Sequence, residues 1–366
     1  MRELILEQWR LIDLGKADPY MAQTYYEAVA EAVHRDMSPN TLILVQPDSP
    51  YACIGYHQDL EKEIDLKYIK ESKLPVIRRS QGGGATYLNS DQVFYQIIFK
   101  NSKALPTKVD KLFENLLNVT VSSYRRLGVP AEFKPLNDIV VENRKISGNG
   151  AGTHETASIL VGNFIMDLNY SQMARVLKVP DAKFRDKMAS SMEQWVSSLR
   201  KELGTTPSPT IIKEVYVEEF SEQLGVEIVK GSPTEDEYII YRNETLPRHT
   251  GRDWLYMDSP LYKPGRAVKI AHMVKVVEVD HKAGKLLRLR AEVQGEQIID
   301  LRITGDLFVV PKEAVFQLEQ CLIGSMLDEN ELTDKINKFY DEKILESPGV
   351  TVKDYVDAFM KLKSFT

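Results

Sequence analysis

The stretch VIRRSQGGGATY, from Val76 to Tyr87, places two arginines directly before three consecutive glycines. Glycines lose much backbone freedom on folding, so a run of them indicates a close approach or positive φ angles. Backbone N–H groups in such a loop can cradle phosphate oxygens, and arginine forks bind phosphates or carboxylates. The alternative is a tight hairpin with two solvated arginines. The stretch matches neither the phosphate-binding loop that ends in Lys-Ser/Thr nor GxGxxG.

Strands are predicted on both sides of this loop. PVIRRS leads into it, and DQVFYQIIF, which follows, is apolar nearly throughout, as in a buried strand. NTLILVQ, YACIGY and ILVGNFIMDL predict further strands. One helix is predicted to begin at Asp18-Pro19, an N-cap followed by proline at the first helical position. Two more are predicted at about 108–127, ended by Gly128, and in SPTIIKEVYVEEFSEQLG, ended by Gly225.

The second informative stretch is NDIVVENRKISGNGAG, residues 137–152. It predicts a strand, a turn at Asn143 and a second strand that begins near Lys145, directly before another glycine-rich segment. An exposed hairpin lysine is the plain interpretation. Two glycine-rich loops and one lysine can instead surround a nucleotide phosphate.

The sequence changes character near Pro260. The proline- and glycine-bearing segment SPLYKPGR is followed by alternating stretches that predict a small antiparallel sheet. PKEAVFQLEQCLIGSML and ELTDKINKFYDEK then predict two helices. This order after a mixed α/β block predicts two domains and an α+β class.

The composition limits the function classes. The 366 residues are 43% hydrophobic and 27% charged, with a net charge of −6, which argues against a nucleic-acid partner. Two distant cysteines, Cys53 and Cys321, form no disulfide framework or zinc ligand set and suit a reducing cytosol. The apolar run at the N-terminus is too short for a signal peptide, and no segment is long enough to span a membrane. We therefore expect a cytoplasmic protein with no membrane association.

RRSQGGGATY followed by NDIVVENRKISGNG resembles the lipoate–protein ligase branch of the biotin/lipoate ligase superfamily. SSMEQWVSSLRKEL, RHTGRDWLYMDSP and ITGDLF are similar to later segments of that family. The resemblance implies an α+β, class II synthetase-like biotin/lipoate ligase fold, in which a large catalytic domain has mixed and antiparallel sheets flanked by helices. It implies a catalytic domain at 1–257, a linker at 258–265 and a small α/β accessory domain at 266–366.

The resemblance also implies a two-step activity. ATP, with Mg²⁺, would activate lipoate to lipoyl-AMP, and the lipoyl group would pass to a specific lysine of a lipoyl carrier. The carrier would be an E2 subunit of a 2-oxoacid dehydrogenase, the glycine-cleavage carrier protein or another lipoyl carrier. Lipoate and octanoate both fit a slender apolar tunnel, so the acyl substrate stays open. We expect a monomer.

Individual residues take roles from the resemblance. Lys145 corresponds to the catalytic lysine that bridges the α-phosphate and the acyl carbonyl, and Arg79 to an arginine near both. Asp138 would face the phosphates and hold Mg²⁺. The substrate- and adenylate-binding residues would be Arg79, Gly82, Gly83, Gly84, Ala85, Thr86, Tyr87, Asn137, Asp138, Ser147, Gly148 and Asn149.

The sequence departs from the family at two places. Leu88-Asn89 stands where many relatives have His-Asp, and Val161-Gly162 where many have His-Gly. Gln81, directly before the three glycines, resembles the glutamine in the RGGQ loop of the octanoyltransferase branch. That branch moves octanoyl between carriers without ATP through a cysteine thioester. The absence of cysteine between residues 54 and 320 argues against that transferase. A non-catalytic acyl- or nucleotide-binding relative is the other alternative, and biotin ligation is disfavoured because the GRGRxG-type loop is absent.

The accessory domain is expected to move after adenylate formation and let the carrier dock, with a pivot near 256–265. Pro260, Pro264 and Gly265 bracket a short connector, which suits a defined hinge. A rigidly docked domain is the alternative.

Overall fold

The computed structural model of the chain describes residues 6–106, 109–135, 137–179, 182–257, 274–343 and 345–366. Contacts divide the chain into two units. Unit 1 comprises Met1–Cys53, Ile64–Arg79 and Thr86–Gly251, and unit 2 comprises Ile54–Glu63, Ser80–Ala85 and Arg252–Thr366. The glycine loop is thus grouped with the C-terminal segment. The expected linker at 258–265 lies outside the described residues, and the expected domain bounds stay a prediction.

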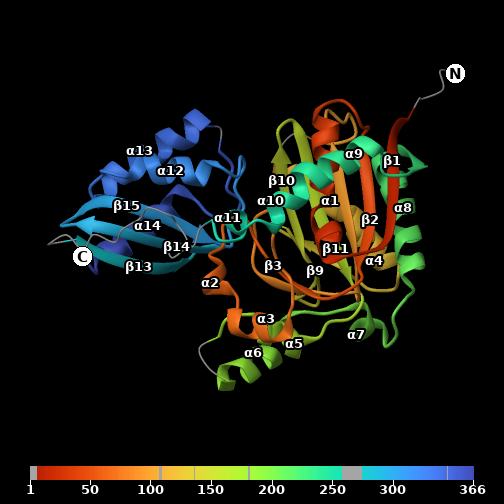
Figure 1. Ribbon diagram of the computed structural model, residues 1–366, viewed down its shortest axis with the longest axis horizontal. Helices are drawn as coiled ribbons and strands as arrows, with labels where there is room; N and C mark the ends of the chain where they lie inside the picture. Colours follow the sequence, from red (N-terminus) through yellow and green to blue (C-terminus); the bar gives the residue numbers. More distant parts are fainter. Residues whose placement is uncertain (1–5, 107–108, 136, 180–181, 258–273, 344) are drawn as a thin grey trace. The chain divides into compact units, whose positions relative to one another are not determined.

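Unit 1 is built on a six-stranded sheet in the order β10-β11-β6-β2-β1-β12 (Figure 1). The strand β1 runs parallel to both of its neighbours, and the other pairs are antiparallel. The sheet is therefore mixed, which agrees with the mixed and antiparallel sheets that the resemblance implied. Its strands are β1 (Glu7–Ala17), β2 (Thr41–Pro47), β6 (Gln92–Phe99), β10 (Asn149–His154), β11 (Ala157–Ile165) and β12 (Val226–Gly231).

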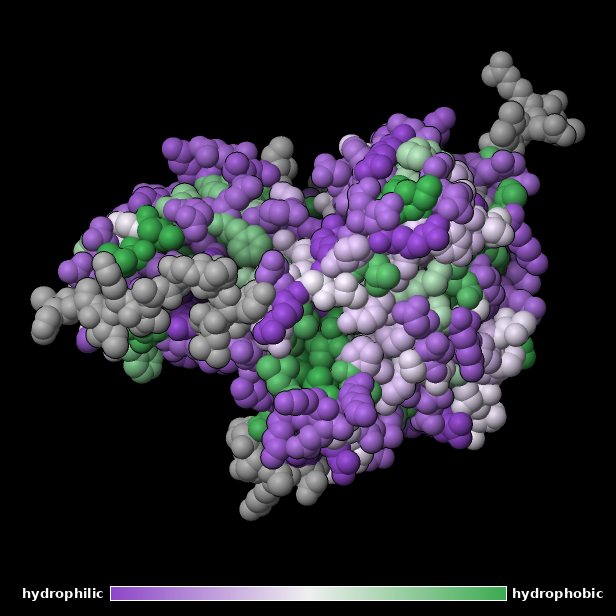
Figure 2. Space-filling model, in the orientation of Figure 1, coloured by the Kyte–Doolittle hydropathy of each residue, from purple (hydrophilic) through white to green (hydrophobic). Residues whose placement is uncertain are grey.

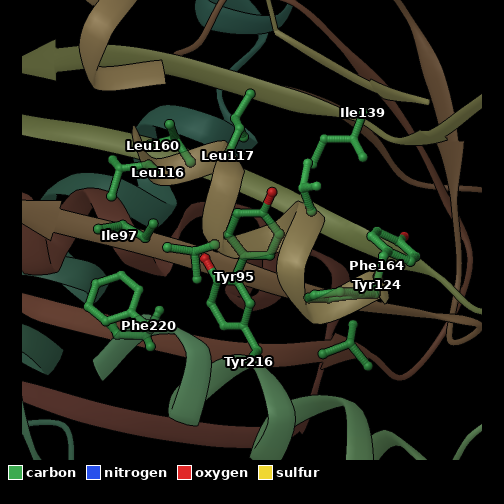
Figure 3. Close-up of a cluster of buried hydrophobic side chains, with 14 of the residues drawn as sticks. Tyr95, Ile97, Leu116, Leu117, Tyr124, Ile139, Leu160, Phe164, Tyr216 and Phe220 are labelled. Atoms are coloured by element: carbon green, nitrogen blue, oxygen red, sulfur yellow. The ribbon is translucent and has the colours of Figure 1, made fainter. Parts of the chain in front are cut away.

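Helices cover both faces of this sheet, which explains why β2 and β6 are apolar nearly throughout. Neighbouring residues point to opposite faces. Thus Ile97 packs in the cluster with α4 (Val109–Arg126) and α8 (Pro209–Leu224), whereas Ile98 packs in the cluster with α1 (Pro19–His34). Figure 3 shows aromatic side chains meeting in the first cluster.

The predicted helix starts and stops are confirmed at several places. Asp18 caps α1 by accepting hydrogen bonds from the backbone N–H groups of Tyr20 and Met21. Ser208 caps α8, and Gly225 ends that helix in the left-handed conformation. Of the remaining helical segments, the bounds are α2 (Leu60–Glu63), α3 (Leu66–Ser72), α5 (Tyr170–Val176), α6 (Ala182–Trp195), α7 (Leu199–Leu203), α9 (Glu235–Ile240), the π-helical turn η1 (Tyr241–Thr245), α10 (Leu246–Thr250) and α11 (Arg252–Leu255).

Two small sheets present the motifs. The glycine loop joins β4 (Val76–Arg78) to β5 (Thr86–Leu88), and both strands flank β3 (Tyr51–Ile54), so the predicted strand–loop–strand arrangement is confirmed. The second motif forms β8 (Asp138–Val141) and β9 (Arg144–Ser147), next to a third strand. Asn143 in the turn has a φ of 64°, as predicted for a turn asparagine. The third strand is β7 (Glu132–Lys134).

In unit 2, the described residues form the predicted antiparallel sheet and, after it, three helices where two were predicted. The sheet runs in the order β13-β14-β15, and two of its helices correspond to the predicted pair. The additional helix, α14 (Val352–Lys363), begins at Thr351, whose side chain forms a capping box with Asp354. Its apolar face, which includes Phe359, joins the core of the unit. The other elements are β13 (Val274–Lys282), β14 (Leu286–Gln294), β15 (Gln297–Gly305), α12 (Ala314–Leu322) and α13 (Glu329–Lys343).

The surface of α13 illustrates the amphipathic pattern. Its apolar residues Leu332, Ile336 and Phe339 are buried, and hydrophilic side chains form most of the surface around this helix (Figure 2). Within the described ranges, no helix combines the length and the apolar character that crossing a membrane requires.

Candidate functional site

Lys145 lies on β9, opposite Val140 of β8. Its ammonium nitrogen is 2.6 Å from Oδ1 of Asp138, at the beginning of β8. The side chains are 39% and 33% exposed, so the ion pair is accessible to a ligand. An ammonium held at a fixed place on a strand can stabilise negative charge that develops on a bound phosphate. Asp138 suits a Mg²⁺ ligand in a nucleotide complex, because this ion usually takes one or two carboxylates in addition to phosphate oxygens.

The backbone of Lys145 is fixed from two sides. Besides pairing with β8, its carbonyl accepts a hydrogen bond of 2.8 Å from the N–H of Ser197. Ser197 lies between α6 and α7, in the segment SSMEQWVSSLRKEL that is similar to a later segment of the lipoate–protein ligases. Arg144, next to the lysine, forms an ion pair of 2.9 Å with Glu202 of α7. The chain around 195–203 therefore determines where β9 lies.

Buried polar side chains shape the turn between β9 and β10 that follows Lys145, which we call the corner. Asn137 Nδ2 donates to the carbonyl of Asn149 at 2.6 Å, and Asn149 Nδ2 donates to the carbonyl of Asn137 at 3.0 Å. Ser147 Oγ donates to the carbonyl of Asn163 at 2.6 Å, and Asn163 Oδ1 accepts from the N–H of Gly148 at 2.8 Å. These residues hold the turn between β9 and β10. Whether any of them also touches a nucleotide stays a prediction.

The structure adds two residues to this corner. Tyr95 of β6 donates its hydroxyl to Asn149 Oδ1, and burial raises the pKa of Tyr95, so the hydroxyl stays a donor at neutral pH. Gln92 Oε1 accepts from Asn163 Nδ2 at 2.6 Å. The sequence contained a signal for both, because polar side chains in an otherwise apolar buried strand need partners.

The two arginines of the opening motif have different environments. Arg78 is 0% exposed, so the alternative of two solvated arginines is wrong for this residue. Arg79 is partly buried, and its Nη1 lies 3.6 Å from Sγ of Cys53. Cys53 is buried, and burial raises the pKa of its thiol, although Arg79 opposes this shift. Thr86 and Tyr87 lie on β5, paired with Cys53 and with its neighbour on β3.

Within unit 2, the glycine loop approaches backbone closely. A Cβ atom at Gly82 would lie 1.9 Å from the carbonyl oxygen of Leu307. Gly83 has a φ of 95° and donates its N–H to the same oxygen at 3.2 Å. A Cβ at Gly84 would lie 3.4 Å from Oδ1 of Asp306. The first two glycines are thus required by contact and by conformation.

The predicted site residues therefore occur in three groups. The residues around the catalytic candidate lie on or directly beside β8, β9 and β10. A second group lies on or directly beside β4 and β5, and the loop residues belong to unit 2. The first group comprises Asn137, Asp138, Lys145, Ser147, Gly148 and Asn149. The second comprises Arg79, Thr86 and Tyr87. The third comprises Gly82, Gly83, Gly84 and Ala85.

Among known proteins, the chain is similar in sequence both to lipoate–protein ligases and to octanoyltransferases. The chain is 28% identical over 269 residues to octanoyltransferase LipM of Moorella thermoacetica, covering 68% of this chain and 98% of that protein. It is 26% identical over 338 residues to lipoate-protein ligase LplJ of Bacillus subtilis, covering 90% of this chain and 91% of that protein.

Solved structures confirm the fold. A bipartite lipoate protein ligase from Thermoplasma acidophilum superimposes with a TM-score of 0.60 at 25% identity, covering 68% of this chain and 96% of that one. P. falciparum LipL1 in complex with lipoate has the same fold, with a TM-score of 0.67 at 17% identity and 98% coverage of both chains.

The family model described as lipoyl protein ligase A/B catalytic domain matches residues 18–221. This region contains both glycine-rich motifs and Lys145, and it is more than half of the chain. The resemblance seen in the sequence is thereby confirmed, and the chain belongs to the lipoyl protein ligase A/B catalytic domain family.

Proposed function

We propose that the protein is a lipoate–protein ligase, which uses ATP to convert lipoate to lipoyl-AMP and transfers the lipoyl group to a lysine of a lipoyl carrier. The family contains ATP-independent octanoyltransferases as well, so the choice rests on the chemistry of this chain. The observation that carries the proposal is the number and burial of the cysteine thiols in the family-matched region. A transferase needs a reactive cysteine for its thioester, and the family-matched region 18–221 has only the buried Cys53.

Cys53 is unsuited to nucleophilic attack. The reactive form of a cysteine is the thiolate, and burial raises the pKa of this thiol. Cys321 is exposed, but it lies on α12, outside the family-matched region. The match to the ligase LplJ also extends over 90% of this chain, whereas the match to LipM covers 68%. Both observations favour the ligase.

In the first step, an oxygen of the lipoate carboxylate attacks the α-phosphorus of ATP, and pyrophosphate leaves. Lys145 would stabilise the charge that develops on the α-phosphate and, in the second step, on the acyl carbonyl. Bound Mg²⁺ would neutralise phosphate charge, and Asp138 would hold it. In the second step the carrier's lysine amine attacks the acyl carbon, AMP leaves as the C–O bond breaks, and the amine loses a proton.

The resemblance implies roles for the other groups. Arg79 would contact lipoate and phosphate, the glycine loop would lie against the acyl chain and nucleotide, and residues 85–87 would meet adenine through backbone groups. The corner would hold Lys145 in position against the adenylate through Asn137, Ser147, Gly148 and Asn149. The Thermoplasma ligase was solved with its E2 lipoyl domain, which supports a lipoyl domain as the carrier here.

Lipoate-dependent exchange of pyrophosphate into ATP tests the proposal. The wild-type protein should catalyse it, and Lys145→Ala should lower the rate about 10²–10³-fold. Lys213→Ala is a matched control, because Lys213 also lies 2.6 Å from an aspartate oxygen, in unit 1; its exchange rate should match wild type. Exchange by Lys145→Ala at a rate near that of wild type would refute the assigned role of Lys145.

The same protein preparation tests the transferase. Octanoyl-carrier protein would be mixed with an acceptor lipoyl domain without ATP, and transfer would be measured by mass. Transfer under these conditions, without any exchange activity, would establish the transferase instead. Absence of both activities with lipoate and octanoate would favour a non-catalytic relative. Mass shifts of several carriers with ATP and lipoate would identify the acceptor.

A further inference from the structure

A buried charged cluster joins three distant parts of unit 1. Glu27 of α1 and His249 of α10 are 2% and 1% exposed. His249 Nε2 lies 2.9 Å from Glu27 Oε1, and His249 Nδ1 lies 2.9 Å from the carbonyl oxygen of Arg78 on β4. Arg248 forms an ion pair with the other oxygen of Glu27, and Tyr26 donates its hydroxyl to Glu27 Oε1 at 3.3 Å.

The carbonyl partner determines the role of Nδ1. A carbonyl oxygen only accepts hydrogen bonds, so Nδ1 of His249 must donate to Arg78. Nε2 of the same ring faces the Glu27 carboxylate, which also interacts with Arg248 and Tyr26. Glu27 therefore holds the ring in the orientation in which Nδ1 reaches the carbonyl of Arg78.

Such a cluster is a weak source of stability, because desolvation of buried charges offsets most of their attraction. Its geometric effect is more specific. The carbonyl of Arg78 belongs to the peptide that links Arg78 to Arg79, so the hydrogen bond from His249 sets the orientation of that peptide. Arg79 is where the chain leaves β4 and enters the glycine loop.

We propose that His249, held by Glu27, is a positioning residue for Arg79 in the adenylate-forming step. This inference rests on the proposed function, in which Arg79 contacts lipoate and phosphate. It adds that the placement of the guanidinium depends on a side chain 170 positions later in the sequence. Small displacements of a positioned group cost up to about 10²-fold in rate.

Two substitutions separate positioning from folding. In His249→Asn, the amide nitrogen can replace Nδ1 and keep the bond to Arg78, whereas the contact with Glu27 is lost. In His249→Gln, the longer amide can replace Nε2 and keep the bond to Glu27, whereas the bond to Arg78 is lost. Both variants lose one buried hydrogen bond, so their thermal unfolding should change similarly. We expect kcat/KM for exchange to fall ~10–100-fold further in His249→Gln than in His249→Asn.

A double-mutant cycle links the effect to Arg79. In an Arg79→Ala background, exchange by the His249→Gln and His249→Asn variants should differ less than twofold, because no guanidinium is left to position. Equal losses in the two single variants, or a difference that persists without Arg79, would overturn the proposal.

A readout that needs no activity keeps the two proposals separable. In ¹⁵N NMR spectra, Nδ1 of His249 should show the shift of a protonated nitrogen, and the amide signal of Arg79 should move in His249→Gln more than in His249→Asn. If wild type lacks exchange but these shifts occur, the proposed function fails and the positioning of the Arg79 backbone stands. A His249 ring without a proton on Nδ1, or an Arg79 signal equally perturbed in both variants, would overturn the positioning itself.

Discussion

The substitution Gly162→Ala tests how tightly the corner beside Lys145 is built. Gly162 of β11 lies opposite Asn149 of β10. An added Cβ atom would lie 2.2 Å from Asn149 Oδ1 and 2.3 Å from Tyr95 Cζ. Nonbonded atoms normally stay about 3.5–4.0 Å apart, so both side chains would have to move by about 1 Å.

Neither side chain can move freely. Tyr95 is fully buried and stacks on Tyr216 with ring centroids 4.6 Å apart, as Figure 3 shows. Asn149 is held by its two bonds with Asn137. Overpacking of a core costs about 1–3 kcal/mol, and loss of the Tyr95–Asn149 hydrogen bond adds about 1 kcal/mol. We therefore expect the free energy of unfolding to fall by about 2–4 kcal/mol.

Urea unfolding followed by near-ultraviolet circular dichroism of the buried tyrosines measures this change. Gly148→Ala is the matched control, because its added Cβ would have Asn163 Oδ1 as nearest neighbour, at 3.6 Å, an ordinary contact. It should change the free energy of unfolding by less than about 1 kcal/mol. If Gly162→Ala is as stable as Gly148→Ala, the corner is not as rigid as its contacts indicate.

Other outcomes follow from the same structure. Asp138→Asn should keep the fold but raise the Mg²⁺ concentration that gives half-maximal exchange by about 10-fold, because the proposed Mg²⁺ site loses one charged ligand. An unchanged Mg²⁺ dependence would show that Asp138 is not a ligand of the metal. Iodoacetamide at pH 8 should alkylate Cys321 and spare Cys53 in the folded protein, because burial raises the pKa of Cys53; mass spectrometry that finds Cys53 modified first would contradict this. The pKa of Tyr124 is raised by burial, so its contribution to stability is complete below about pH 10 and is lost as the pH rises toward its folded pKa. The difference in tyrosinate absorbance between wild type and Tyr124→Phe should therefore appear together with unfolding above about pH 10, and a difference that appears without unfolding would show that this hydroxyl is accessible. Proteolysis at 256–265 should change on addition of lipoate and ATP if the accessory domain moves, and an unchanged pattern would indicate rigid docking.

Local signals in the sequence were sufficient for many elements. Asp18-Pro19 predicted the start of α1, and Gly225 predicted the end of α8, because caps act within one turn of the helix. The turn at Asn143 and the strand of Lys145 were likewise visible in a short window. α14 was missed, although Thr351 and Asp354 form a capping box that the sequence displays.

Long-range pairing was beyond the reach of such signals. Glu7 of β1 pairs with Val226 of β12, more than 200 residues later in the chain. Neither segment contains a local signal that identifies the other as its partner. The bond from His249 to Arg78 has the same character. A lone histidine before a turn does not reveal a buried acid on another helix. The need for glycine at 162 also became visible only when Tyr95 and Asn149 were seen on either side of it.

The pairing of β1 with β12 has a consequence for shortened forms of the protein. A fragment that stops at residue 221 contains the entire family-matched region, yet it lacks β12, which begins at Val226. The backbone groups of β1 on that side would then face water as an open edge, a common starting point for intermolecular aggregation. The same cut would remove His249. Expression trials of an isolated catalytic domain should therefore extend at least through Gly251, the last residue of unit 1.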